Sequence, residues 1–180
     1  QRFGWTALHD VHWPGRQRAN IDHIAIGPGG VVVIDAKNWS GDVSIRDGEL
    51  RQNGHRRTEE VTGVVQQADA ITAMLAPEHR MCVAPLLCPA AHDQEAVKVH
   101  PGAVVLGRHQ LAQTLAALPY RLTPYEVADL GRYLHRELGG QKSPQLLTTA
   151  ALDHPPRQRS PRDGAAAAAR PVSSRTRAPR

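Results

Sequence analysis

Short apolar runs separated by turn residues fill the first third of the chain. WTALHDV (5–11), NIDHIAI (20–26) and VVVIDAK (31–37) have the length and β-branched content of strands. GPGG joins the last two, and Asp-Gly at 47–48 divides DVSIRDGELRQNG into a hairpin. The pattern predicts two hairpins, with a turn-rich loop, WPGRQRAN (13–20), before the first.

Helical periodicity appears later in the chain. Apolar residues recur at helical spacing between Glu59 and Ala76, and Pro77 ends that pattern. MCVAPLL (81–87) and AVVLG (103–107) resemble strands, although Pro85 weakens the first of them. HQLAQTLAAL, at 109–118, predicts a short helix.

The last predicted helix has a clear start and end. Thr123 is a suitable N-cap, Pro124 takes the first helical position, and Glu126 completes a capping box. Gly139 and Gly140 end the helix. Strands therefore come first, followed by helix, strand, strand, helix and helix. This order predicts an α/β (α+β) domain with a mixed central sheet, N-terminal β-hairpins and flanking helices.

Composition changes after the last helix. Residues 139–180 are rich in Pro, Arg, Ser and Ala, which predicts a disordered tail following a domain at 1–138. The tail holds eight basic and two acidic side chains, a net charge of +6, which leaves −1 for residues 1–138 of a chain whose total is +5. The basic charge of the whole chain is therefore no evidence that the folded domain binds nucleic acid.

The sequence predicts no membrane contact and a reducing compartment. No apolar run approaches the roughly 18 residues that span a bilayer. Cys82 and Cys88 are separated by roughly 20 Å of strand, beyond disulfide reach, which favours the cytoplasm. The chain begins with Gln1 rather than Met, so we expect a fragment or a processed piece.

Three charged residues interrupt the apolar strands of the first hairpin. Charged side chains are rarely buried without a partner or a function. A two-residue or four-residue turn within GPGG gives one register, in which Asp22 faces Asp35. Lys37 follows two residues after Asp35 and projects from the same face. We therefore expect two carboxylates and one ammonium in a single patch.

This patch suits the hydrolysis of a phosphodiester. Two carboxylates can hold Mg²⁺ (or Mn²⁺), which polarises a phosphate and lowers the pKa of a bound water. Lys37 can orient or deprotonate that water, and the Ala36 carbonyl would point near the metal. The spacing leaves one alternative open: a buried Asp–Lys ion pair at the strand end, with Asp22 capping a loop.

Other candidate groups are weaker. His79, Cys82, Cys88 and His92 fit no zinc spacing. We expect His23 to point to the opposite face from Asp22 as a hydrogen-bonded packing residue.

The motifs W-T-x-L-H-D and A-N-I-D-H-I-x-I-G-P-G-G-V-x-V-I-D-A-K-N-W-S-G closely resemble the nuclease-related domain (NERD) family of the PD-(D/E)XK nuclease superfamily. The resemblance is dense over residues 5–41 and continues loosely to about Leu118. It implies a restriction-endonuclease-like core, Asp22 and Asp35 as metal ligands, and Lys37 as the catalytic lysine.

The resemblance also implies two groups outside the hairpin. One is Gln67, a polar residue facing the site from the following helix. The other is a glutamate on a helix preceding Trp5, which we expect this chain to lack because it begins at Gln1. The D-A-K tripeptide replaces the E-x-K of many relatives.

DNA is the expected partner, and basic residues of two loops are candidates to contact its phosphates. Arg16 and Arg18 lie just before Asp22, and the second hairpin carries Arg51, His55, Arg56 and Arg57. A solvated surface is the alternative for both groups. Two functions stay open: a metal-dependent nuclease acting on DNA, or a non-catalytic nucleic-acid-binding or scaffold module that keeps the fold.

Overall fold

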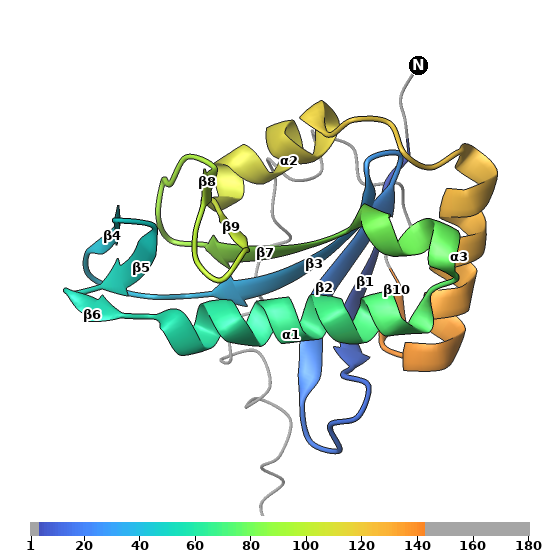
Figure 1. Cartoon of the computed structure of the whole chain (residues 1–180), viewed down its shortest axis with the longest axis horizontal. Helices are drawn as coiled ribbons and strands as arrows, with labels where there is room; N and C mark the ends of the chain where they lie inside the picture. Colours follow the sequence, from blue (N-terminus) through green and yellow to red (C-terminus); the bar gives the residue numbers. More distant parts are fainter. Residues whose placement is uncertain (1–3, 143–180) are drawn as a thin grey trace, which may run out of the picture.

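A mixed sheet organises the computed structural model, which describes residues 4–142 (Figure 1). Seven strands of the described chain form this sheet, in the order β10–β1–β2–β3–β7–β9–β8. Their bounds are β10 (Gln141–Lys142), β1 (Thr6–His12), β2 (Asn20–Gly27), β3 (Gly30–Lys37), β7 (Val83–Pro89), β9 (Val104–Val105) and β8 (Val97–Lys98). The neighbours of β3 are β2, antiparallel, and β7, parallel. The α+β class and the mixed sheet predicted from the sequence are confirmed.

The first hairpin has the predicted register. Its ladder runs from Gly27–Gly30 to His23–Ile34, around a two-residue turn of Pro28 and Gly29. Gly30 has a φ of +124°, and a Cβ there would lie 2.3 Å from the carbonyl oxygen of Cys82. Only glycine combines this conformation with this close approach. Gly30 therefore fixes the residue at which the turn ends and β3 begins.

Pro85, which weakens the strand pattern in the sequence, lies in β7, an inner strand of the sheet. Pro85 pairs in register with Val33 on β3, and β9 joins the other edge of β7 only at Leu86 and Leu87. Leu106 donates its amide to Leu87 O, so the backbone groups of Leu87 point towards β9. Pro85 lies two residues before Leu87, so its backbone also faces the β9 side of β7. Because β9 pairs only with Leu86 and Leu87, the missing N–H of Pro85 removes no ladder bond.

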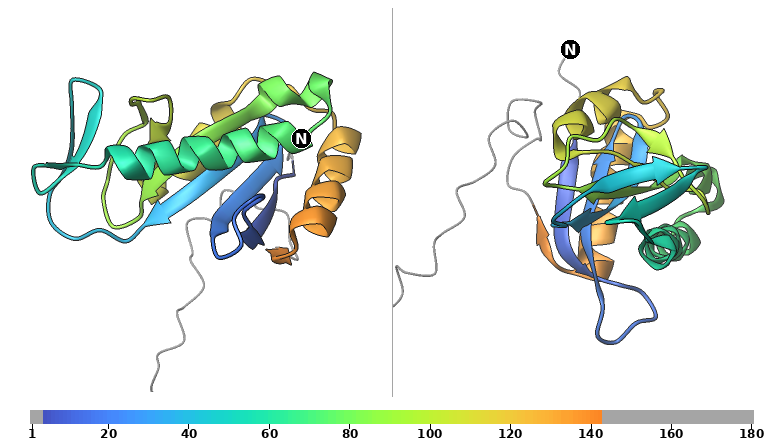
Figure 2. Two further views of the ribbon diagram at one scale, coloured as in Figure 1. Left: turned by 60° about the horizontal axis from the view of Figure 1, so that its bottom comes forward. Right: turned by 90° about the vertical axis from the view of Figure 1, so that its left-hand side faces the viewer.

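Helices cover both faces of the sheet (Figure 2). The helices α1 (Thr58–Met74) and α3 (Pro124–Leu138) pack on one face, where they share a buried core with Ile24, Val31 and Val33. The other face is covered by α2 (Arg108–Ala117), which packs Leu115 against Val32 and Ile34. Alternation along β3 therefore sends odd-numbered side chains towards α1 and even-numbered ones towards α2.

The predicted helix start at Thr123 is confirmed. The Thr123 hydroxyl accepts from the Glu126 amide, and the Glu126 carboxylate accepts from the Thr123 amide. Such a cap is worth about 1 kcal/mol. The short 3-10 helix η1 (Pro77–Cys82) follows α1, which ends near the predicted position.

The ordered chain continues further than the composition suggested. Gln141 and Lys142 form β10 and pair with His9 and Leu8 of β1, whereas the sequence placed these residues in a disordered tail. The rest of that predicted tail, 143–180, lies outside the described residues.

A second, smaller sheet extends beyond the end of the main one (Figure 2). It contains β4 (Val43–Arg46), β5 (Glu49–Gln52) and β6 (His55–Arg56). Positive φ angles at Asp47 and Gly48, and again at Asn53 and Gly54, close its two turns. The sequence predicted the first turn and missed β6, whose signal was Asn53-Gly54.

Cys82 and Cys88 are free thiols, as their spacing predicted, and both are buried. Within residues 4–142, helices of the length and apolar character needed to cross a bilayer are absent.

Candidate active site

The charged patch forms where β2 separates from β3. The ladder ends at His23–Ile34, one pair before the predicted pair of Asp22 with Asp35. Asp22 instead turns its carboxylate Oδ2 to the amide of Ala36, at 2.9 Å. The side chain of Asp22 thus satisfies a backbone N–H that the departing strand leaves without a ladder partner.

Asp35 lies deeper than its neighbours in the patch. Its side chain is 8% exposed, and its Oδ1 lies 2.6 Å from the Nζ of Lys37, whose side chain is 31% exposed. Both side chains project from the α1 face of β3, because Asp35 and Lys37 have the parity of Val31 and Val33. The ion pair therefore joins a buried carboxylate to an ammonium that still reaches solvent.

Burial raises the pKa of Asp35 to about 6. Lys37 opposes this shift through its hydrogen bond and its charge, whereas the charge of Asp22 and a hydrogen bond with its carboxyl add to it. Desolvation outweighs the attraction of Lys37 because the carboxylate loses water on nearly all sides. The patch therefore favours an additional positive charge or a shared proton.

The backbone of Ala36 adds an oxygen to the patch. Its N–H points to the β2 side of β3, where it meets Asp22. The C=O and N–H of one residue in a strand point to the same side. The Ala36 carbonyl therefore also faces the gap that opens between β2 and β3.

Gln67 lies in the layer between α1 and the sheet. It is buried with Val64, Ala68 and Ile71 on the face of α1 that packs against the core. Its Oε1 is shielded from solvent and lacks a hydrogen-bond partner among the described residues. A buried amide oxygen without a donor is costly, so this atom is suited to receive a proton donor or a cation.

The two loop arginines lie in the segment between β1 and β2. Arg16 stacks over Trp13, with its guanidinium carbon 4.9 Å from the ring centroid, and its Nη2 lies 3.4 Å from the Gln66 Oε1. This contact places Arg16 against α1 at the residue before Gln67. Arg18 is exposed on the same loop.

Supporting contacts that the sequence did not predict hold the segment after Lys37. Gln52 is buried; it donates to Ser40 O at 2.8 Å and accepts from Arg57 Nη2 at 2.6 Å. Arg57 also lies over Trp39, 5.5 Å from its centroid. In the sequence, the only hints of these contacts are Trp39, two residues after Lys37, and Arg57, immediately before α1.

Two further expectations concern histidines and cysteines. His23 points away from Asp22, and its Nδ1 lies 2.8 Å from Nδ1 of His9, so the predicted packing histidine is confirmed. Burial lowers the pKa of both rings.

Among residues 4–142, His, Cys, Asp and Glu side chains do not gather in groups of three or more around a possible metal position. Asp10 is exposed and accepts from Asn20 Nδ2 at 2.7 Å.

One comparison with known proteins gave a result. A family model of the nuclease-related domain, NERD, matches residues 1–90, which is half of the 180-residue chain. The matched range includes Asp22, Asp35, Lys37 and Gln67. Neither the curated proteins nor the solved structures yielded a match. The resemblance identified from the hairpin motifs is confirmed.

Proposed function

The chain belongs to the nuclease-related domain family, and from this premise we propose that it hydrolyses phosphodiester bonds of DNA with Mg²⁺ or Mn²⁺. The family match gives the nuclease relation in general terms. The observation that carries the specific proposal is the buried Asp35 carboxylate, which is held against Lys37 beside Asp22 at the opening between two strands.

The donors at this opening fit a hard cation in chemical type. Asp22, Asp35 and the Ala36 carbonyl supply oxygen, which Mg²⁺ prefers, and leave room for water ligands. Burial raises the pKa of Asp35 although Lys37 opposes the shift, so an added cation would stabilise the charged carboxylate. When bound, the metal would polarise the phosphate and lower the pKa of an attacking water.

Lys37 has the position to act on the attacking water. Its Nζ holds Asp35 on one side, while its side chain is partly open to solvent on the other. In this role it orients the water with one N–H and offsets the negative charge that develops on the phosphate. Its ion pair with Asp35 fixes the ammonium in place beforehand.

Polar groups around the patch complete the proposed site. The Oε1 of Gln67, which has no partner among the described residues, would accept a hydrogen bond from Lys37 or from a water and so orient either group. Arg16 and Arg18 bind substrate phosphates from the β1–β2 loop. Trp13 holds the Arg16 guanidinium in a fixed plane, which lowers the entropy lost on binding.

A second candidate function is favoured by the same contacts. Asp22 already accepts from Ala36, and Asp35 already pairs with Lys37. An ion-pair network that satisfies itself in this way is compatible with a non-catalytic module that binds nucleic acid and keeps the nuclease fold.

Nicking of supercoiled plasmid separates the two functions. The chain and its Lys37→Ala variant are compared with Mg²⁺ and, separately, with Mn²⁺. Arg132→Ala, which removes an exposed arginine on α3, is the control. Wild type and control should nick the plasmid, and Lys37→Ala should not.

Two results would contradict the nuclease proposal. One is nicking by Lys37→Ala at the wild-type rate, which would mean that another site or a contaminant cleaves. The other is absence of nicking in every protein while all remain folded and bind DNA, which would favour the non-catalytic module.

A further inference from the structure

The small sheet carries arginines on one face. Cross-strand pairing places Ser44 opposite Arg51 and Arg51 opposite Arg56, and the next row pairs Arg46 with Glu49. Paired residues share a face. We call these five residues the arginine face. The opposite face presents Val43, Ile45 and Leu50 to the hydrophobic core.

The arginine face has more positive charge than its own acid can neutralise. Glu49 Oε2 lies 2.9 Å from Arg51 Nη2 and 3.0 Å from Arg56 Nε, so one carboxylate serves two guanidinium groups. Arg46 is exposed, and Nε of Arg51 has no acceptor among the described residues. Three arginines against one glutamate leave a surplus of two positive charges.

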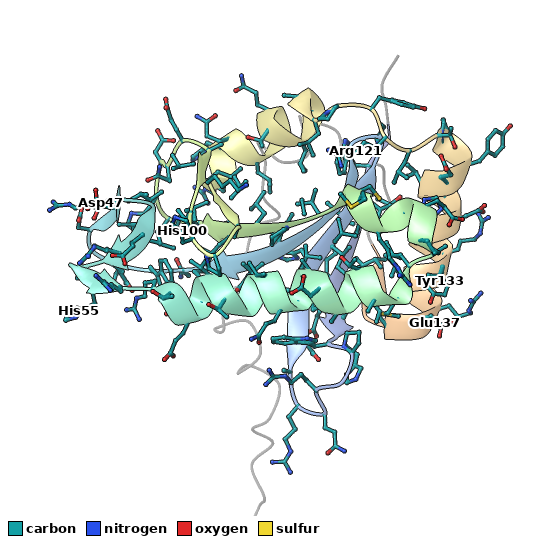
Figure 3. All side chains as sticks on the ribbon, in the orientation of Figure 1. Asp47, His55, His100, Arg121, Tyr133 and Glu137 are labelled. Carbon is teal, nitrogen blue, oxygen red and sulfur yellow. The ribbon has the colours of Figure 1, made fainter. Side chains whose placement is uncertain are left out.

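The sheet that bears this face is fixed at both ends. At its tip, His100 donates its amide to Gly48 O at 2.9 Å, and Figure 3 shows His100 beside the Asp47 turn. At its base, Asn53 Oδ1 accepts from the Asp42 amide, and Asn53 N donates to Asp42 O, both at 2.8 Å. The arginines are therefore held on a braced surface, which reduces the ordering cost of binding.

The chain connects this surface directly to the charged patch. Residues 38–42 alone separate Lys37 from Val43. Gln52, on the inner face of β5, bonds Ser40 in this connection and Arg57 at the start of α1. The small sheet therefore extends from the end of β3 that bears the patch.

We propose that the arginine face binds the sugar-phosphate backbone of the nucleic acid whose scissile phosphate lies at Asp22, Asp35 and Lys37. The inference rests on the proposed function for the position of the substrate. Closely spaced phosphates match a row of guanidinium groups, which bind them with paired N–H donors. In this surface Arg46 and Arg56 contact phosphates, while Glu49 keeps Arg51 extended between them.

The test compares two double variants that remove equal charge. Arg46→Gln/Arg56→Gln alters the arginine face, and Arg132→Gln/Arg136→Gln removes two exposed arginines from α3, at the other end of the molecule (Figure 1). Anisotropy of a labelled DNA duplex measures affinity in the presence of a chelator, so that cleavage does not contribute. Thermal unfolding confirms that each variant is folded.

The salt dependence of affinity gives the expected magnitude. Each lost phosphate contact lowers the slope of log K against log salt by about 0.9, so the arginine-face variant should lose about 1.8. Its affinity deficit relative to wild type should then shrink about 12-fold between about 50 and 200 mM salt. The α3 variant should keep the wild-type slope.

The result that overturns the proposal is an equal slope in the two folded double variants, or absence of duplex binding by the wild-type chain. This outcome is distinguishable from failure of the nuclease proposal. A chain that never nicks plasmid but loses salt-dependent affinity only in Arg46→Gln/Arg56→Gln supports the arginine face without the catalytic site.

Discussion

Asp35→Asn tests whether the buried carboxylate is held at an energetic cost. The substitution keeps the shape of the side chain and removes the charge. Burial raises the Asp35 pKa from 3.8 to about 6 in the folded protein, even though Lys37 opposes the shift. In the unfolded chain the carboxyl returns to its ordinary pKa of about 3.9.

The sign of the effect follows from these two pKa values. Between about pH 4 and pH 6 the folded protein keeps a proton that the unfolded chain has released, so stability falls as pH rises through this range. A difference of about two pKa units corresponds to about 3 kcal/mol. The asparagine variant has no such titration. Its free energy of unfolding should therefore rise relative to wild type by up to about 3 kcal/mol between about pH 4 and pH 7.

Urea unfolding across this pH range, with a chelator present, measures the difference. Asp69→Asn, at an exposed position of α1, is the matched control and should follow wild type. The histidines contribute equally to both proteins, so subtraction removes them. Plasmid nicking by Asp35→Asn should be lost although the protein stays folded.

A difference that stays constant with pH would refute the reasoning, because it would show that Asp35 does not titrate differently in the folded state. A difference of opposite sign would show that the attraction of Lys37 exceeds the cost of burial.

Two other positions give separate tests. Gly30→Ala should lower the free energy of unfolding in urea by at least about 2 kcal/mol, because the new Cβ adds overlap with Cys82 O to the strain of positive φ. Gly54→Ala, at a position with positive φ but open space, should lower it less. Equal losses in the two variants would disprove the steric argument. Cys88 should react slowly with a thiol reagent in the folded protein and rapidly in denaturant, because burial raises its pKa to about 11; rapid native labelling at Cys88 would contradict this.

Local patterns in the sequence were enough to predict much of the hairpin and its charged face. Period-two alternation and the Pro28-Gly29 turn determine which side chains share a face, so the sequence alone predicts that Asp22, Asp35 and Lys37 lie together. The start of α3 was equally predictable, because its capping box lies within four consecutive residues.

The features that could not be predicted depend on distant parts of the chain. The pairing of Gln141 and Lys142 needs the free edge of β1 and leaves no composition signal. The β2–β3 ladder ends at His23 because the two strands diverge, so the side chain of Asp22 accepts from the Ala36 amide and its backbone does not pair with Asp35. The contacts of Gln52 with Ser40 and Arg57 likewise join three separate segments.

The two-residue turn of the first hairpin determines which insertions this site tolerates. Asp22 lies upstream of Pro28 and Gly29, and Asp35 and Lys37 lie downstream, so the turn length sets their alignment. One added residue would force either a bulge or a one-residue slip that turns Asp22 to the side now occupied by His23. Two added residues at the tip preserve the alignment. Among related sequences, loops of even length should therefore be compatible with the paired acids, and loops of odd length should accompany their loss.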